Sequence, residues 1–166
     1  MPTDLLAFYR GGRDTEGRTL DQILAWDDVE LEYVHDYIQW LFPTTRRSAF
    51  NPVAPVLTDE VISFFRRDGA LRDRLLAAFD RMLRFYGFVR VKGAVERGPA
   101  WARRSREWLA PGDHNLRRIT RILDSLSTLG LGDEARAFLR ALEALDERER
   151  RAIGPQTYRY WREATR

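Results

Sequence analysis

The stretch from Leu31 to Pro43, LEYVHDYIQWLFP, mixes aromatic rings with side chains that can do chemistry. Glu32 and Asp36 lie one helical turn apart, so their carboxylates could receive a cation or share a proton. Glu32-x-x-His35 has the spacing with which di-iron helices present a carboxylate and an imidazole. That chemistry needs a second such motif, which this sequence lacks, so we expect no metal site.

A second group of reactive side chains lies in DHNLRRITRIL, from Asp113 to Leu123. A helix there places one set of side chains opposite the leucine and isoleucine stripe: His114, Arg117, Arg118, Arg121 and Ser125. The free N–H groups of the first turn, together with the arginines, could bind a carboxylate or another anion. The alternative is a solvated basic face that is held by ion pairs within the helix.

Covalent catalysis has few candidates in this sequence. There is no cysteine, and His35 and His114 are the only histidines. Glycine-rich phosphate loops, G-x-S-x-G elbows and H-E-x-x-H motifs are also missing. One alternative is an enzyme whose site brings His35 and His114 together. We expect a binding protein rather than an enzyme, with no cofactor.

Length and composition predict a single domain over residues 1–166. The chain carries a net charge of +3, and no apolar run approaches the roughly 20 residues of a membrane span. The first residues, MPTDLLAFYRGG, do not show a basic segment followed by an apolar one, so we expect no signal peptide. These features predict a soluble, cytoplasmic protein, and they leave its oligomeric state open.

Arginine provides almost all of the positive charge, since Lys92 is the only lysine. Arginine-rich codons of a GC-rich genome explain this bias, and selection for phosphate or carboxylate contacts is the alternative. Residues 84–106 hold seven basic side chains against one acidic one, Glu96. Trp101 and Trp108 lie among these arginines, so binding of nucleic acid or another polyanion is an alternative function. Core packing is the expected role of most tryptophans.

Capping residues and apolar periodicity predict roughly eight helices. Thr19 with Gln22, Asp27 with Glu30, and Thr58 are expected to begin helices in the first part of the chain. Residues 28–41 are expected to form one helix that ends before Pro43. At 100° per residue, half of its circumference is apolar, and Glu32, His35, Asp36 and Gln39 form a polar strip on the other side. That strip either faces water or lines a cleft.

The second part of the chain is also predicted to be helical. We expect helices over residues 71–86, 101–109, 114–129, 134–150 and from 155 onward, with Asp113 and Asp133 as caps. Residues 88–98 alternate valine with charged side chains, which predicts either a small hairpin or an irregular arm. The fold class is therefore all-α.

Several motifs occur in one order along the chain: FYRGGRDTEGR, LEYVHDYIQWLFP, SAFNPVAPVLTDEV, MLRFYGF, HNLRRITRILDSLSTLGL and QTYRYW. Together they resemble the conserved region of the opioid growth factor receptor family, over nearly the whole chain. The resemblance implies an all-α domain. Animal members are described as receptors for an enkephalin peptide that are associated with the nuclear periphery and restrain cell proliferation.

This chain differs from the animal members at its C-terminus. It ends just after the conserved region, without their basic tail and C-terminal repeats. Together with the arginine and alanine bias, this indicates a bacterial relative.

The resemblance also suggests residues for a site that binds a peptide or small molecule. The candidate positions are those that match the motifs: Glu32, His35, Asp36, Gln39, Trp40, Asn51, His114, Asn115, Arg118 and Arg121. As a hypothesis, Glu32 and Asp36 receive a peptide amine, and Tyr37 or Trp40 packs against an aromatic ring. Arg118 and Arg121 bind a carboxylate. This hypothesis requires the two polar surfaces to meet.

Overall fold

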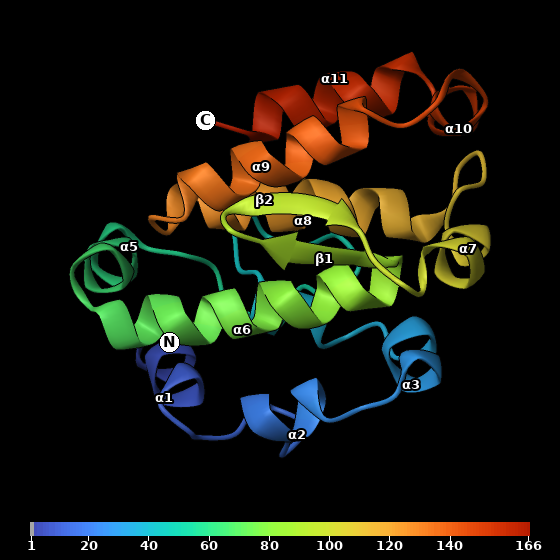
Figure 1. The fold of residues 1–166 in the computed structure, drawn as a ribbon. Helices are drawn as coiled ribbons and strands as arrows, with labels where there is room; N and C mark the ends of the chain where they lie inside the picture. Colours follow the sequence, from blue (N-terminus) through green and yellow to red (C-terminus); the bar gives the residue numbers. More distant parts are fainter. Residues whose placement is uncertain (1) are drawn as a thin grey trace. The chain divides into compact units, whose positions relative to one another are not determined.

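The computed structural model describes residues 2–166 and is mainly α-helical, as predicted (Figure 1). These residues form eleven α-helices, one short 3-10 helix and one two-stranded hairpin. The chain divides into two compact units, of which the first ends at Ala78 and the second spans Phe79–Arg166. Helix α6, Gly69–Tyr86, runs through the boundary. The single domain over residues 1–166 stays a prediction.

The first unit contains five helices before α6. They are α1 (Pro2–Tyr9), α2 (Leu20–Leu24), α3 (Asp28–Tyr33), α4 (Ile38–Leu41) and α5 (Asp59–Arg67). Three predicted caps are confirmed: Thr19 forms a capping box with Gln22, and the side chains of Asp27 and Thr58 accept backbone N–H groups of α3 and α5. These bonds satisfy N–H groups that a helix leaves without partners.

Aromatic rings hold the first unit together. Phe8 on α1 packs edge-on against Trp40 on α4, with ring centroids 5.3 Å apart. Tyr9 packs in the same way against Phe65 on α5 at 4.9 Å, and its buried hydroxyl donates to the carbonyl of Leu41. Burial raises the pKa of Tyr9 far above its usual range, which keeps the hydroxyl protonated as a donor.

The predicted helix over residues 28–41 is wrong in one respect, because it is two helices. Val34 is extended, and the chain between α3 and α4 is irregular. In a continuous helix the Leu31 carbonyl would accept the N–H of His35. Here the buried Tyr37 hydroxyl donates to that carbonyl at 2.7 Å and satisfies it at the end of α3. Tyr33, which a continuous helix would place on the apolar face with Tyr37 and Trp40, is 74% exposed.

The second unit begins with the end of α6 and continues through a hairpin and five more α-helices. The strands are β1 (Phe88–Val91) and β2 (Ala94–Arg97), and the helices are α7 (Trp101–Arg104), the 3-10 helix Ser105–Glu107, α8 (His114–Thr128), α9 (Gly132–Glu143), α10 (Glu147–Ile153) and α11 (Pro155–Ala164). The hairpin confirms one of the two alternatives for residues 88–98. Its two-residue loop, Lys92–Gly93, has positive φ at both positions, as a type I′ turn requires.

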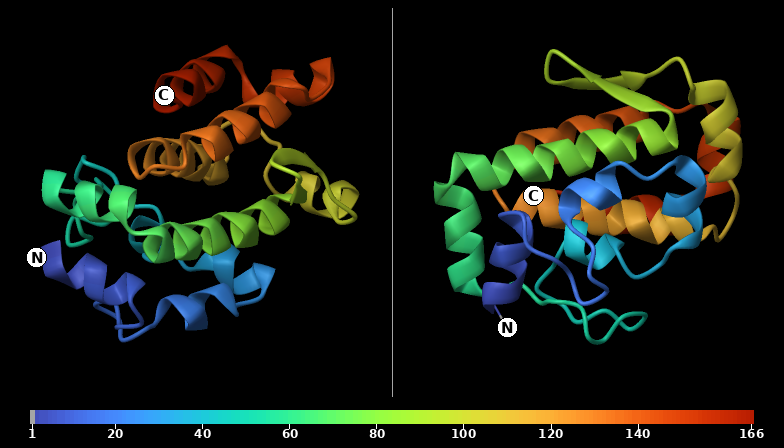
Figure 2. Two further views of the ribbon diagram at one scale, coloured as in Figure 1. Left: turned by 60° about the vertical axis from the view of Figure 1, so that its left-hand side comes forward. Right: turned by 90° about the horizontal axis from the view of Figure 1, so that it is seen from below.

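Helices α8, α9 and α11 lie side by side, and β2 packs against α9 (Figures 1 and 2). The predicted helix over residues 134–150 is in fact α9 and the first part of α10. The break occurs because Asp146 forms a capping box with Glu149 and begins a new helix. Asp133 is not a cap as predicted, since α9 begins at Gly132 after Leu131.

The core of the second unit contains a cluster of rings around Phe88. This ring lies 4.9 Å from the ring of Trp101, 5.8 Å from that of Phe138 and 6.3 Å from that of Trp108. Trp108 is fully buried and donates its indole N–H to the Tyr86 carbonyl at 2.9 Å. Trp108 therefore has the core role that the sequence predicted for most tryptophans.

Gly87 connects α6 to this cluster. Its φ is +99°, and a Cβ atom there would lie 2.9 Å from the Cα of Trp101. Only glycine fits both the left-handed backbone and the close approach of α7.

Within residues 2–166, every helix is too short or too polar to cross a lipid bilayer.

Candidate functional site

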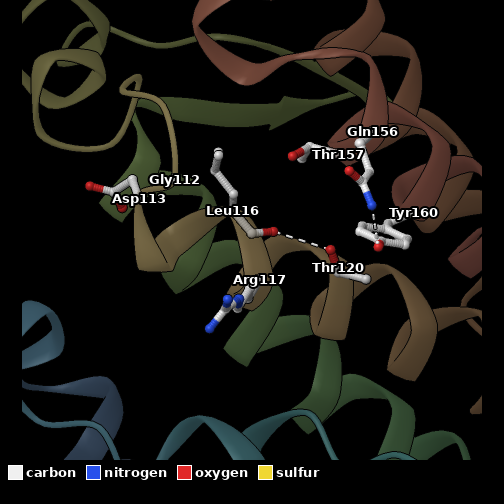
Figure 3. A pocket seen from close by; sticks show the side chains of 8 residues that line it. All are labelled: Gly112, Asp113, Leu116, Arg117, Thr120, Gln156, Thr157 and Tyr160. Atoms are coloured by element: carbon white, nitrogen blue, oxygen red, sulfur yellow. Dashed lines mark hydrogen bonds between the residues drawn. The ribbon is translucent and has the colours of Figure 1, made fainter.

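A groove with a volume of about 320 Å³ lies between the start of α8 and the first turns of α11 (Figure 3). Its walls come entirely from the second unit. The lining residues are Gly112, Asp113, Leu116, Arg117, Thr120, Gln156, Thr157 and Tyr160. The groove therefore joins two segments that are about 40 residues apart in the sequence.

The α8 wall is positioned by the cap of that helix. Asp113 accepts the backbone N–H of Asn115 at 2.8 Å, as the sequence predicted for a cap at this position. Leu116 and Thr120 then follow one turn apart on the groove side, and the Thr120 hydroxyl donates to the Leu116 carbonyl at 3.1 Å. Arg117 is exposed beside them.

The α11 wall is fixed by contacts at both ends of the groove. Pro155 occupies the first helical position, where its missing N–H costs nothing. Gln156 donates to the hydroxyl of Tyr160, one turn later, at 2.7 Å. Trp161 is buried and donates its indole N–H to the Leu116 carbonyl at 3.1 Å. Because this bond joins α11 to α8, the two walls of the groove keep a fixed spacing.

The groove combines apolar and charged groups in the way that ligand sites commonly do. The ring of Tyr160, which is 48% exposed, supplies most of the apolar surface, because Leu116 is only 5% exposed. Asp113 and Arg117 supply opposite charges. The remaining side chains are neutral hydrogen-bonding groups, Thr120, Gln156 and Thr157. This set can orient a small ligand that carries a ring and charged ends.

Four of the ten predicted site residues lie on α8, and none of them lines this groove. Asn115 is fully buried, and its Oδ1 accepts hydrogen bonds from the Tyr86 hydroxyl at 3.4 Å and from Arg118 at 3.5 Å. Arg118 is buried as well. The expected solvated face is therefore partly a buried polar layer between α8 and the end of α6.

The other two predicted residues of α8 are less buried. His114 is exposed, and its Nδ1 lies 3.9 Å from Asp113 Oδ1. Arg121 is half-buried, and this burial lowers the pKa of its guanidinium, whereas the nearby Asp124 carboxylate raises it.

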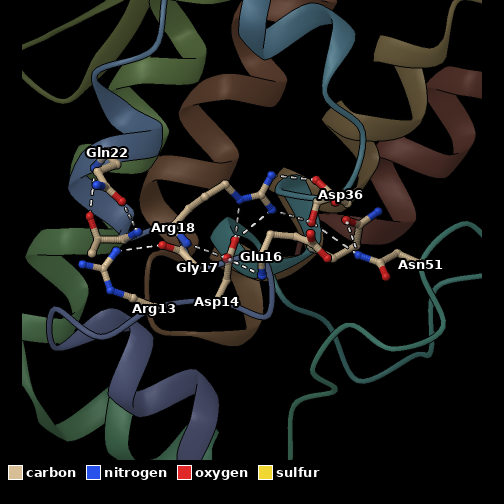
Figure 4. A network of polar contacts seen from close by, with 10 residues as sticks. Arg13, Asp14, Glu16, Gly17, Arg18, Gln22, Asp36 and Asn51 are labelled. Carbon is tan, nitrogen blue, oxygen red and sulfur yellow. Dashed lines mark hydrogen bonds and ion pairs between the residues drawn. The ribbon is translucent and has the colours of Figure 1, made fainter.

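The six remaining predicted residues belong to the first unit, where three of them join a polar network (Figure 4). Arg18 is its centre: it contacts the buried carboxylate of Asp14 at 2.8 Å and Asp36 Oδ1 at 2.8 Å. Asn51 donates to the Asp36 carbonyl at 3.3 Å and to Gln39 Oε1 at 3.4 Å. The network connects the turn after α1, the start of α4 and the long loop before α5.

This network has the features of a structural scaffold. Asp14 accepts the backbone N–H groups of Glu16 and Arg18, both at 2.9 Å, which closes a turn. Burial alone would lower the pKa of Arg18, but its hydrogen bonds to Asp14 and Asp36 outweigh burial and raise it. The Arg18 guanidinium also lies over the ring of Trp26. The sequence signal for this cluster is the Asp-x-x-Gly-Arg turn from Asp14 to Arg18, which does not by itself point to Asp36 or Asn51.

The last three residues of the predicted site are separated by the break after α3. Glu32 lies on α3, whereas His35 is in the irregular segment that follows, so they do not share a helical face. Trp40 is buried against Phe8. Among residues 2–166, no group of three or more His, Cys, Asp or Glu side chains is arranged to hold a metal ion.

Comparison with known proteins gives the family. Residues 6–164 match the opioid growth factor receptor (OGFr) conserved region. The opioid growth factor receptor of Rattus norvegicus is 40% identical over 76% of this chain and 23% of its own length. Opioid growth factor receptor-like protein 1 of Mus musculus is 38% identical over 69% of this chain and 25% of its own.

The matching region is therefore a quarter or less of these relatives. The opioid growth factor receptor of Homo sapiens shows the same relation, with 39% identity over 78% of this chain and 20% of its own length. No solved structure matches the chain at a significant level. The motifs, the helical fold and the match over residues 6–164 agree, and the chain belongs to the opioid growth factor receptor conserved-region family.

Proposed function

We propose that this chain is a ligand-binding module of the opioid growth factor receptor family, and that it binds a short peptide or small molecule in the groove between α8 and α11. The groove itself is the observation behind this proposal. Its volume of about 320 Å³ is close to the lower end of small-ligand pockets, roughly 300–1,000 Å³. The relatives that share the domain are named as receptors, which supports the same class of function.

The lining residues define the kind of ligand. The exposed ring of Tyr160 offers a surface for an aromatic ring, next to the buried Leu116. Arg117 offers a guanidinium for a carboxylate, and Asp113 offers a carboxylate for an amine. A short peptide with a free amine, a ring and a free carboxylate carries all three groups.

The ten residues inferred from family resemblance stay a prediction for the same function. Their proposed roles meet competing contacts, since Asp36 is paired with Arg18 at 2.8 Å, and Tyr37 and Trp40 are buried. In the groove, Tyr160 and Arg117 are exposed, which is why we place the ligand there.

Isothermal titration calorimetry with short aromatic peptides tests the proposal. Tyr160→Ala and Arg117→Ala should each weaken binding by about tenfold or more, the loss of one good contact. Arg159→Ala removes a neighbouring arginine that does not line the groove, and it should bind as the wild type does. Glu32→Ala and Arg121→Ala test the residues inferred from family resemblance in the same assay. Absence of heat at millimolar peptide would contradict binding both in the groove and at the residues inferred from family resemblance.

The polyanion alternative has less support. Arg97 lies over the Trp101 ring at 4.6 Å, but it also pairs with Glu149, and Arg104 is buried with its Nε donating to the Phe85 carbonyl. Those arginines therefore have structural roles. Retention on heparin that falls steeply with salt would revive this alternative. The enzyme alternative requires His35 and His114 to act together, and it also stays a prediction.

A further inference from the structure

Helix α3 exposes two large apolar side chains on one face. Val29 is 63% exposed and Tyr33 is 74% exposed, and they are four residues apart, so they lie next to each other on the helix surface. A helix normally turns such a pair toward the core. Here Leu31 is the buried residue of α3, and the Val29–Tyr33 pair points to solvent.

The surroundings of this pair are acidic. Residues 19–45 contain six Asp or Glu side chains and no Lys or Arg, although the whole chain has a net charge of +3. Two of the six are neutralised within the first unit, because Asp36 pairs with Arg18 and Asp21 contacts Arg74 at 3.4 Å. Two other acids, Asp27 and Glu30, are exposed and lie within two residues of Val29 in the sequence.

We propose that the exposed α3 face, made by Val29, Tyr33, Asp27 and Glu30, is a docking surface for a cationic, apolar peptide segment of a partner protein. The apolar pair supplies exposed surface whose burial against a partner is favourable. The acids select a partner with Lys or Arg, by attraction and by repulsion of acidic segments. An anionic membrane surface is disfavoured by the same charges. This surface lies in the first unit and is independent of the proposed groove.

The probe for this surface is a short amphipathic peptide of lysine and leucine with helical periodicity. Its glutamate–leucine and lysine–serine counterparts are the controls for charge and for apolar contact. The wild-type chain should bind only the first peptide, and backbone amide shifts in an NMR titration should be largest in α3. Binding should weaken as salt is added.

Two variants and two matched controls isolate the surface. The double variant V29S/Y33S should lower affinity at least about tenfold, because both apolar anchors are lost. Glu30→Lys should lower affinity by about threefold to tenfold. Val91→Ser and Glu60→Lys change an exposed valine and an exposed acid elsewhere, and they should bind as the wild type does. Both anchors are exposed, so V29S/Y33S should retain the wild-type melting temperature.

Three results would overturn this proposal. The first is that the lysine–leucine peptide binds V29S/Y33S as tightly as the wild type. The second is that the wild-type chain binds none of the three peptides. The third is a concentration-dependent dimer in sedimentation that V29S/Y33S does not form, since the surface would then take a second copy of this chain. If Tyr160→Ala abolishes binding of the short aromatic peptides, only the groove proposal is affected, and the proposal for the α3 surface stands.

Discussion

Arg97, at the end of β2, and Glu149, in α10, form an ion pair in which the guanidinium donates to Glu149 Oε1 at 2.7 Å. The same oxygen accepts the backbone N–H of Asp146 at 2.9 Å, which completes the capping box of α10. One carboxylate therefore begins a helix and attaches the hairpin to it.

Replacing Glu149 should cost more than replacing Arg97. Glu149→Ala should lower the free energy of unfolding by about 1–2 kcal/mol, because it removes a cap bond and an ion pair. Arg97→Ala should cost about 1 kcal/mol or less, since its side chain is 44% exposed and water screens the pair. Urea denaturation measures both values. Glu147→Ala, which breaks the more exposed pair with Arg151, is the control and should be nearly neutral. Equal losses for Glu149→Ala and Glu147→Ala would contradict this account.

The network around Arg18 predicts a structural role for Asp36. Asp36→Asn should lower the free energy of unfolding by about 1 kcal/mol, because the charge-assisted bond from Arg18 weakens. Hydrogen exchange should become faster in residues 13–19, which Arg18 ties to the start of α4. The control is Glu16→Gln, an exposed acid in the same turn, and it should leave both measurements unchanged.

A different outcome for Asp36→Asn would favour the resemblance-based site. If stability and exchange are unchanged while peptide binding is lost, then Asp36 receives the ligand amine rather than holding the turn.

A buried hydroxyl in α8 predicts a stabilising substitution. Ser125 is fully buried, and its Oγ has no hydrogen-bond partner among residues 2–166. Burial of an unsatisfied hydroxyl costs free energy, so Ser125→Ala should raise the free energy of unfolding by about 1 kcal/mol or more. Ser63→Ala, at an exposed helical position in α5, is the control for helix propensity and should gain only about 0.5 kcal/mol. A loss of stability in Ser125→Ala would show that the hydroxyl has a partner.

Tyr158 predicts a loss of stability at alkaline pH. Burial raises its pKa to about 12, and its hydroxyl donates to the Leu142 carbonyl at 2.6 Å. The unfolded chain releases this proton near pH 10, whereas the folded chain keeps it. The contribution of Tyr158 is therefore complete below pH 10 and is lost as the pH rises toward 12.

Denaturation of wild type and Tyr158→Phe on either side of this window measures the effect. The variant should be less stable at neutral pH, because it lacks the bond to Leu142, and the difference between the two proteins should shrink above pH 10. Tyr160→Phe, at an exposed position of the same helix, should lose stability at alkaline pH as the wild type does. A constant difference at all pH values would exclude this role.

Local signals predicted most helix starts. Thr19, Asp27, Thr58 and Asp113 all cap helices as expected, because their bonds to the first-turn N–H groups depend only on neighbouring residues. The break after Tyr33 could not be predicted in this way. It has no glycine or proline, and it depends on a hydroxyl from Tyr37 that satisfies the Leu31 carbonyl. The break at Asp146 had a local signal in its capping box with Glu149, which the surrounding charged residues obscured.

The groove was harder to predict than the helices. The sequence predicted Arg117 on the polar face of its helix, but the residues that line the opposite wall, Gln156, Thr157 and Tyr160, come from the other end of the chain. No periodicity or motif pairs those two segments, since only packing through Trp161 brings them together. Burial of Asn115 and Arg118 was also unpredictable, because a polar side chain in a helix pattern suggests a surface position.

The type I′ turn of the hairpin places Lys92 at an exposed tip. Because this residue is the only lysine, apart from the α-amino group the chain offers a single amine to acylating reagents. An activated ester of a fluorophore or of biotin will therefore modify the protein at one defined side chain. Such a conjugate carries its only side-chain reporter on the second unit, at Lys92, and the α-amino group is the one other amine that the reagent can modify.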